Sequence, residues 1–229
     1  DYIDVRRARG RVNKFGMVVG RTGTQKTACF REYVLRNNHG SPWWLETPAG
    51  GALGEFLAKL GACSGLGNQT TTNKKRHHLL RVVQESKCII IDNAQDLYNG
   101  RRDLLAFNFL RELQDTTGCA IILSITPVFE KELVSGMLAS YFEQFVGRTG
   151  GTRKWLRLPD YPPEEDVLLI AKTFGLRDAE KHAKTLLGIS RELGRIRRLF
   201  DDLQDAKRLA QSRKQGLTID HVIEIRGEE

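Results

Sequence analysis

The feature that most constrains the fold is a glycine-containing run set between a short apolar segment and a helical one. Residues 17–19 are apolar and lead to Gly20, and the stretch from Lys26 to Leu35 is typical of a helix. Strand, glycine turn and helix in this order are the start of a βαβ unit, whose strands are parallel. We therefore expect an α/β fold with a parallel sheet flanked by helices.

The glycine run itself matches the phosphate-binding pattern G-x-x-x-x-G-K-[ST] at three of its four fixed positions. Backbone N–H groups in such a loop, and at the helix N-terminus after it, face phosphate oxygens. We expect Lys26 to reach the β- and γ-phosphates of ATP and the Thr27 hydroxyl to bind Mg²⁺. A chance match in a chain with 22 glycines is the alternative. The expected nucleotide-binding residues are Gly20, Arg21, Thr22, Gly23, Thr24, Gln25, Lys26, Thr27 and Ala28.

Gln25 occupies the position of the missing second glycine. Glycine is used there because the backbone approaches phosphate closely and can need a positive φ. A glutamine fits if its φ stays negative and its side chain points away.

A second acidic element of such a site follows the apolar run 87–91. Asp92 ends this run, and we expect it to bind Mg²⁺ directly or through water. Asn93 stands where a glutamate usually orients or deprotonates the attacking water, and an amide cannot take a proton at neutral pH. Slow or absent ATP hydrolysis is the resulting hypothesis. The alternative for Asp92 is a simple strand-end turn aspartate.

A hydroxyl beside the γ-phosphate is expected after the apolar strand 119–123. Thr126 is the first choice and Ser124 the second, because both follow the buried run directly. A hydroxyl that only caps the following turn is the alternative.

The remaining pattern indicates two domains, residues 1–160 as an α/β nucleotide-binding domain and 161–229 as a helical one. Further strands are expected at 16–19, 43–46 and 155–158, and helices at 52–60, 74–84, 101–115 and 128–134. After Pro162-Pro163 we expect only helices, at 164–174, 178–187 and 191–213, with a short piece after Thr218 as N-cap.

The composition of the chain indicates which class of partner it binds and in which compartment it works. The net charge is +8 with a pI near 9.5, which fits a polyanionic partner. Four widely spaced cysteines without a C-x-x-C pair favour neither disulfides nor zinc, so a reducing cytoplasm is expected. We find no membrane-length apolar run and no signal peptide, and since the chain begins with Asp1, we expect it to be part of a longer protein.

The densest basic run of the α/β part follows a threonine-rich segment. We expect duplex DNA to be contacted without sequence preference, since hydroxyls and cations suit phosphates and no aromatic residue interleaves them. A solvated helix start is the alternative. The candidate DNA-binding residues are Thr70, Thr71, Lys74, Lys75 and Arg76, with Lys59 and the loop at 50–51 as weaker ones.

The run 88–97, CIIIDNAQDL, resembles the Walker B segment of the AAA+ transposition regulators, the family of phage Mu transposition protein B (MuB) and TnsC. The helix 110–115 with Gly118 is also similar to that family, and the resemblance spans about residues 12–213. It implies an AAA+ P-loop NTPase fold with a small C-terminal helical lid.

The resemblance also implies two arginine roles. Arg148 matches the position of an arginine finger that reaches a neighbouring subunit's nucleotide, with Arg153 as a rival. Arg197, in a G-x-x-R segment, matches a lid arginine that folds over the nucleotide. The alternatives are a surface arginine for Arg148 and one charge among many on its helix for Arg197.

The function implied by this resemblance is an ATP- and Mg²⁺-dependent homo-oligomer, a helical filament or ring on duplex DNA, that acts as target-DNA adaptor for a transposase. An AAA+ replication initiator or helicase loader is one alternative. A non-hydrolysing P-loop scaffold that does not bind DNA is the other.

Overall fold

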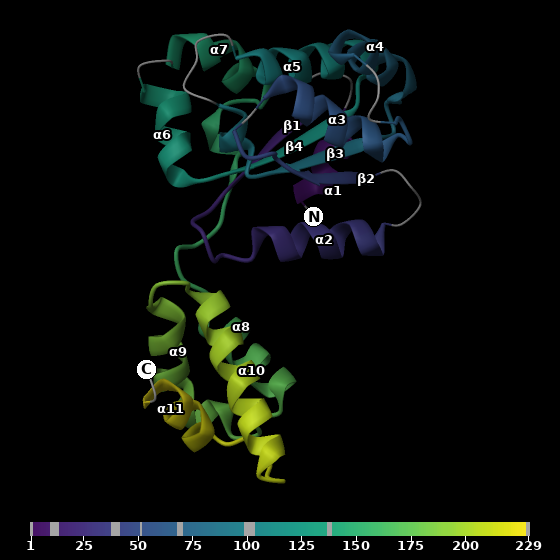
Figure 1. The fold of residues 1–229 in the computed structure, drawn as a ribbon. Helices are drawn as coiled ribbons and strands as arrows, with labels where there is room; N and C mark the ends of the chain where they lie inside the picture. The colour runs from purple at the N-terminus through teal and green to yellow at the C-terminus, as the bar shows by residue number, and fades with distance from the viewer. Residues whose placement is uncertain are drawn as a thin grey trace. The chain divides into compact units, whose positions relative to one another are not determined.

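The computed structural model describes residues 2–9, 14–37, 42–50, 52–67, 71–98, 104–136 and 139–227. The chain divides into two compact units, shown in Figure 1. The first comprises Asp1–Gly20 and Lys26–Leu158, and the second comprises Arg21–Gln25 and Pro159–Glu229. Five residues of the glycine run thus group with the helical unit.

The first unit is built on a five-stranded sheet in the order β2-β3-β4-β1-β5, with every pairing parallel. The central strands β3 and β4 are buried along their whole length because helices cover both faces, which explains their continuous apolar sequence. The predicted parallel α/β fold is confirmed. The strands are β1 Phe15–Val19, β2 Pro42–Glu46, β3 Cys88–Asp92, β4 Ala120–Ile125 and β5 Leu156–Arg157.

Helices lie on both sides of this sheet (Figure 1). On one face, Val18, Ile90 and Ile122 pack against α1 and α2 through Ile3 and Phe30. The other face carries the larger core, under α3 to α7. The helices are α1 Tyr2–Arg7, α2 Lys26–Arg36, α3 Leu53–Cys63, α4 Thr72–Val82, α5 Leu105–Thr117, α6 Pro127–Ser135 and α7 Ala139–Arg148.

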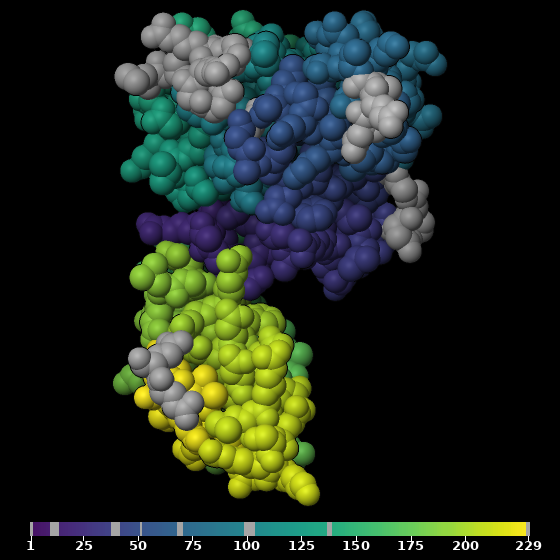
Figure 2. All heavy atoms as spheres, in the orientation of Figure 1, coloured from purple at the N-terminus to yellow at the C-terminus, as the bar shows by residue number. Residues whose placement is uncertain are grey.

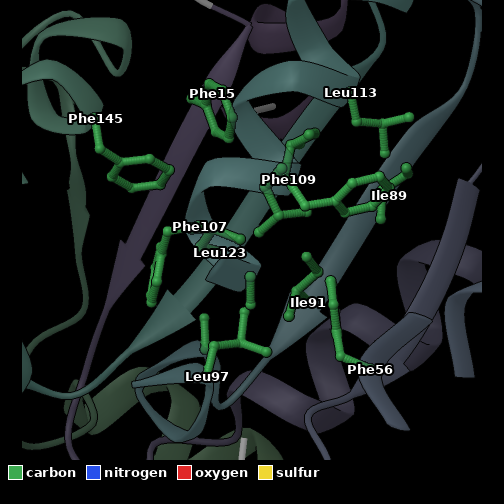
Figure 3. Close-up of a cluster of buried hydrophobic side chains, with 14 of the residues drawn as sticks. Phe15, Phe56, Ile89, Ile91, Leu97, Phe107, Phe109, Leu113, Leu123 and Phe145 are labelled. Atoms are coloured by element: carbon green, nitrogen blue, oxygen red, sulfur yellow. The ribbon is translucent and has the colours of Figure 1, made fainter. Parts of the chain in front are cut away.

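The larger core is rich in aromatic rings, as Figure 3 shows. Phe145 of α7 lies edge-on to Phe15 of β1, with ring centroids 5.0 Å apart, and Phe107 of α5 lies 5.4 Å from Phe145. Edge-to-face pairs of this kind add to the free energy gained by burial. They hold α5 and α7 on the sheet near β1.

The observed elements differ from the predicted ones mainly at short helices. The helices α1 and α7 were not predicted. Helix α1 has only six residues, whereas the buried Phe142 and Phe145 of α7 stand three residues apart, a helical spacing that the sequence analysis missed. The helix predicted at 101–115 is observed as Leu105–Thr117, and residues 101–103 lie outside the described part. The helix predicted at 74–84 is displaced toward the N-terminus, as Thr72–Val82, and the strand predicted at 155–158 is observed as Leu156–Arg157.

The second unit is a helical cluster around Val167, Leu186, Leu199 and Val222. The helix predicted at 178–187 is a 3-10 turn at Ala179–His182 followed by α9. The helix predicted from residue 191 starts at Ile196 because the two preceding residues have positive φ. The α-helices are α8 Glu164–Phe174, α9 Ala183–Arg191, α10 Ile196–Ser212 and α11 Ile219–Gly227. Within the described residues of both units, no helix is long and apolar enough to cross a bilayer.

Candidate nucleotide-binding site

The glycine run leaves the sheet at the carboxyl end of β1. The backbone N–H of Gly20 donates to Ile125 O at 3.1 Å, which ties the start of the loop to the end of β4. The chain then enters α2 at Lys26. Ligands of parallel α/β sheets bind at this edge, beyond the carboxyl ends of the strands.

Lys26 is the buried cation of the site, with a residue exposure of 8%. Its Nζ donates to Gly20 O at 2.6 Å. Burial lowers the pKa of the Lys26 ammonium, and the negative charge of Asp92 acts in the opposite direction. An anion bound here would favour the charged ammonium further, so the lysine fits the phosphates of a nucleotide.

Thr27 and Asp92 meet as the sequence predicted. The Thr27 hydroxyl donates to Asp92 Oδ2 at 2.5 Å, and the Asn93 backbone N–H donates to Asp92 Oδ1 at 3.0 Å. Asp92 is fully buried. A hydroxyl and a carboxylate are the hard oxygen ligands that Mg²⁺ prefers, so this pair fits the ion that accompanies ATP.

Gln25 and Asn93, the two positions where the motifs depart from the usual pattern, share one backbone feature. Their φ angles are +62° and +54°. The negative φ at which a glutamine would fit easily is not observed at Gln25. The loop retains the left-handed conformation for which glycine is normally used, at a cost of about 1 kcal/mol or more for another residue. Asparagine tolerates that conformation better than most residues, which gives Asn93 a structural reason.

The two hydroxyl candidates differ in environment. Thr126 is the N-cap of α6, and its Oγ1 accepts from the Phe129 N–H at 3.3 Å, so it caps the following turn. Ser124 is fully buried in β4, and no described residue forms a hydrogen bond with its Oγ. The second choice is thus the hydroxyl that remains unsatisfied on the sheet.

The candidate arginines lie at the surface. Arg148, in the last turn of α7, forms an ion pair with Asp115 of α5. Its rival Arg153 is exposed in the turn before β5, and Arg197 is exposed at the start of α10. In the second unit it is the neighbouring Arg195 whose Nη1 donates to Thr22 O, at 3.4 Å.

The loop residues of the second unit have contacts of their own. Arg21 pairs with Asp160 at 3.1 Å, and the Thr24 hydroxyl donates to Arg21 O at 2.8 Å. Gly23 has a φ of +85°, which an L-residue rarely adopts. Ala28 lies in the first turn of α2, immediately after the two Walker side chains.

The predicted DNA-binding residues do not share one exposed surface. On α4, which lies at the surface of the first unit (Figure 2), Lys74 is exposed, whereas Lys75 is only 8% exposed and offers little surface for a DNA contact. Arg76 pairs with Glu112 of α5 at 2.6 Å. Thr71 is the N-cap of α4, accepting from the Lys74 N–H at 3.4 Å.

The remaining candidates of that set are Lys59, Thr70 and the loop at 50–51. Lys59, on α3, donates from Nζ to Glu46 O at 3.0 Å. Thr70 lies outside the described residues, as does Gly51 of the weaker loop.

One residue next to the site was missed by the sequence analysis. Glu46 ends β2, in register with Asp92 of β3, and its Oε1 accepts from Asn93 Nδ2 at 3.4 Å. Nothing in a single Trp-Trp-Leu-Glu run marks the last residue as functional. Only the strand order, which places β2 beside β3, brings its carboxylate to Asn93.

A family comparison decides the class of this site. The family model described as "AAA domain" matches residues 9–133, more than half of the chain. The chain belongs to the AAA domain family. AAA domains generally bind ATP with Mg²⁺, which agrees with the lysine, hydroxyl and carboxylate assembled here. No curated protein sequence matches the chain significantly.

Solved structures of AAA+ proteins share the fold of this AAA domain. Domain III of the replication initiation protein DnaA from Thermotoga maritima is 19% identical, with a TM-score of 0.63 over 97% of this chain and 86% of that chain. A RuvB variant from the same organism is 16% identical, with a TM-score of 0.61 over 97% and 64%. Aeropyrum pernix ORC1 in complex with DNA is 19% identical, with a TM-score of 0.56 over 93% and 59%. These similarities show the AAA+ fold.

Proposed function

We propose that this AAA domain is an ATP-dependent DNA-binding protein that assembles on duplex DNA and serves as target-DNA adaptor for a transposase. The ATP-dependent part is supported by Lys26, which is bonded to Gly20 O at the start of the loop, and by the Thr27–Asp92 pair, which together suit Mg²⁺·ATP. The altered positions, Gln25 and Asn93, belong to the loop backbone and to the water-activating position. Nucleotide retention is therefore better supported than rapid turnover.

The adaptor role rests on the resemblance of the Walker B segment to that of the MuB and TnsC regulators. The DNA-binding part is supported by the net charge of +8 and by Lys74 and Arg76, which lie exposed on α4. ORC1, a structure of the same fold, was solved in complex with DNA. Phosphate contacts by lysine and arginine bind duplexes without sequence preference and weaken with salt.

Assembly in trans is supported by the position of Arg148 at the surface. In this proposal Arg148 exchanges its Asp115 partner for the γ-phosphate of a neighbouring subunit, so that ATP links one subunit to the next. Repeated contacts of this heterologous kind form a ring if they close and a helical filament if they do not.

A replication initiator or helicase loader is the second candidate, and the fold similarity to DnaA domain III is the observation in its favour. The two functions differ in the protein partner. Binding of a purified transposase supports the first, and binding of a replicative helicase supports the second.

The experiment that tests the main proposal measures duplex DNA binding by fluorescence anisotropy, with and without Mg²⁺·ATP, over a series of salt concentrations. We expect ATP-dependent, salt-sensitive binding to unrelated duplexes, and electron microscopy of the same samples should show filaments or rings around DNA. Lys74→Ala with Arg76→Ala should weaken DNA binding while ATP affinity is retained. DNA binding that does not respond to ATP would contradict the proposal.

A further inference from the structure

The carboxyl ends of β2 and β3 place three polar side chains next to one another. Glu46 and Asp92 are the last residues of their strands and face each other in register. Asn93 follows Asp92 and reaches Glu46 Oε1 through its Nδ2, at 3.4 Å. Asn93 is thus linked to both carboxylates, to Asp92 through its backbone N–H and to the exposed Glu46 through its side-chain amide.

The alternation of side chains along β2 puts Glu46 on the face of the sheet that α2 covers. Side chains two apart on a strand share a face. Trp44 lies under α2, where the Arg31 guanidinium is 4.8 Å from its ring centroid, so Glu46 lies on the α2 side. Asp92 lies on that side too, because its Oδ2 accepts from Thr27 in the first turn of α2.

The backbone on both sides of Glu46 is fixed. The next residue, Thr47, is buried and donates to Asp92 O from both its N–H, at 3.0 Å, and its Oγ1, at 2.9 Å. Lys59 donates to Glu46 O at 3.0 Å. The two bonds from Thr47 hold the end of β2 on β3, and the bond from Lys59 ties it to α3. The Glu46 carboxylate is therefore carried by a rigid element.

The nearby acidic residues have different environments. The Asp92 carboxylate is already bonded to Thr27 and to the Asn93 N–H. Asp96, in the turn Ala94–Leu97, is exposed, and burial raises the pKa of its carboxyl, with the charge of Glu46 raising it further. Glu46 is the carboxylate bonded to the Asn93 amide.

We propose that Glu46 is the general base of ATP hydrolysis in this protein, and that Asn93 is a positioning residue that orients the Glu46 carboxylate. The inference rests on the proposed binding of Mg²⁺·ATP. A carboxylate can take a proton from water, whereas an amide cannot. The Mg²⁺-binding carboxylate, Asp92, and the general base, Glu46, would then lie on neighbouring strands, whereas both are usually expected at the end of β3.

In the proposed reaction, the oxygen of a water molecule forms a bond to the γ-phosphorus and its proton passes to Glu46. The bond between the γ-phosphorus and the β,γ-bridging oxygen breaks, and the electron pair leaves with ADP. Inorganic phosphate is the second product, and Glu46 returns its proton to solvent. No oxidant or further reactant is needed.

The test compares Glu46→Gln with a matched variant, Glu143→Gln. Glu143 is an exposed glutamate on α7, a helix that packs through Phe145 on Phe15 of β1, away from the β2 edge. Asp96→Asn is added because Asp96 is an exposed carboxylate in the turn that follows β3. Each variant is measured for single-turnover ATP hydrolysis and for equilibrium binding of fluorescent ADP, with Mg²⁺ alone and with Mg²⁺ and aluminium fluoride.

We expect Glu46→Gln to slow single-turnover hydrolysis by about 100-fold or more, the usual range for loss of a general base. Its affinity for Mg²⁺·ADP should stay within about twofold, while its affinity for the aluminium fluoride complex, which mimics the transition state, should fall by about tenfold or more. Glu143→Gln and Asp96→Asn should behave like the wild type. Hydrolysis by Glu46→Gln at the wild-type rate would overturn the proposal, as would a slow Asp96→Asn with an unaffected Glu46→Gln.

The positioning role of Asn93 is tested with Asn93→Gly, which accepts the positive φ and removes only the amide. If Asn93 acts through Glu46, the double variant Glu46→Gln with Asn93→Gly should hydrolyse ATP no more slowly than Glu46→Gln alone. Additive losses of the hydrolysis rate would contradict this role. A wild type that binds Mg²⁺·ATP but does not hydrolyse it overturns the role of Glu46. That result leaves the assembly proposal standing, because assembly is judged by ATP-dependent DNA binding.

Discussion

The ends of β1 and β3, which carry the proposed nucleotide-binding residues, differ from the end of β2. Lys26 and Asp92 are buried, and each has a hydrogen-bond partner within the motifs themselves. Glu46 is exposed, and its link to the site runs through the side chain of Asn93. Binding groups are thus built into the buried loop and strand, whereas the proposed hydrolytic group is placed by the order of the strands. The residues that would carry out hydrolysis can therefore differ while the residues that would bind the nucleotide stay the same.

The largest expected effect comes from the binding side of this comparison. Lys26→Ala removes the buried cation and should weaken ATP binding by about 100-fold, which corresponds to about 2.7 kcal/mol. Titration with a fluorescent ATP analogue measures this. Lys131→Ala is the matched control, because Lys131 is an exposed lysine on α6. A loss no greater than that of the control would show that Lys26 does not contact the nucleotide.

A smaller effect is expected for Asp92→Asn. The amide keeps an acceptor for the Thr27 hydroxyl but removes the charge that attracts Mg²⁺. ATP affinity with EDTA should be unchanged, while the gain in affinity on adding Mg²⁺ should fall by about tenfold. Equal dependence on Mg²⁺ in variant and wild type would mean that Asp92 is not the metal ligand.

The connection between the two strand ends is tested by Thr47→Val. This change removes the hydroxyl bond to Asp92 O and should lower the free energy of unfolding of the first unit by about 1 kcal/mol. If this bond holds Glu46 in place, hydrolysis should slow by about fivefold. Nucleotide affinity should be nearly constant. Thr173→Val, which removes a hydroxyl bond within α8, is the control. Equal loss of binding and hydrolysis would argue against a specific role for the end of β2.

The smallest effect is expected for Gln25→Gly, which restores the common residue of the loop. Glycine relieves the positive φ but adds freedom to the unfolded chain, so we expect a gain of no more than about 1 kcal/mol, or a rise in Tm of a few degrees. Gln25→Ala keeps the unfavourable φ and should show no such rise. Differential scanning calorimetry without nucleotide distinguishes the two variants. A Tm of Gln25→Gly below that of the wild type would contradict the inference that the positive φ strains the backbone at Gln25.

The sequence could predict what depends on local order. Lys26, Thr27 and Asp92 follow from motif spacing, and the parallel sheet follows from apolar runs such as 87–91, because buried parallel strands need continuous apolar residues. Glu46 could not be found this way, since its neighbour Asn93 is distant in sequence and adjacent only across the β2–β3 pairing. The burial of Lys75 was missed because a run of basic residues does not show which side of α4 faces the core.

The left-handed backbone at Asn93 also bears on how such a site can evolve. A glutamate at this position would have to adopt the φ of +54° now held by an asparagine, so the direct replacement carries a conformational penalty. A protein whose general base is Glu46 on β2 would gain little from the replacement of Asn93 by glutamate. Return to the common arrangement would need a second alteration that first reshapes the turn after β3. The backbone at this turn therefore disfavours the single replacement of Asn93 by glutamate.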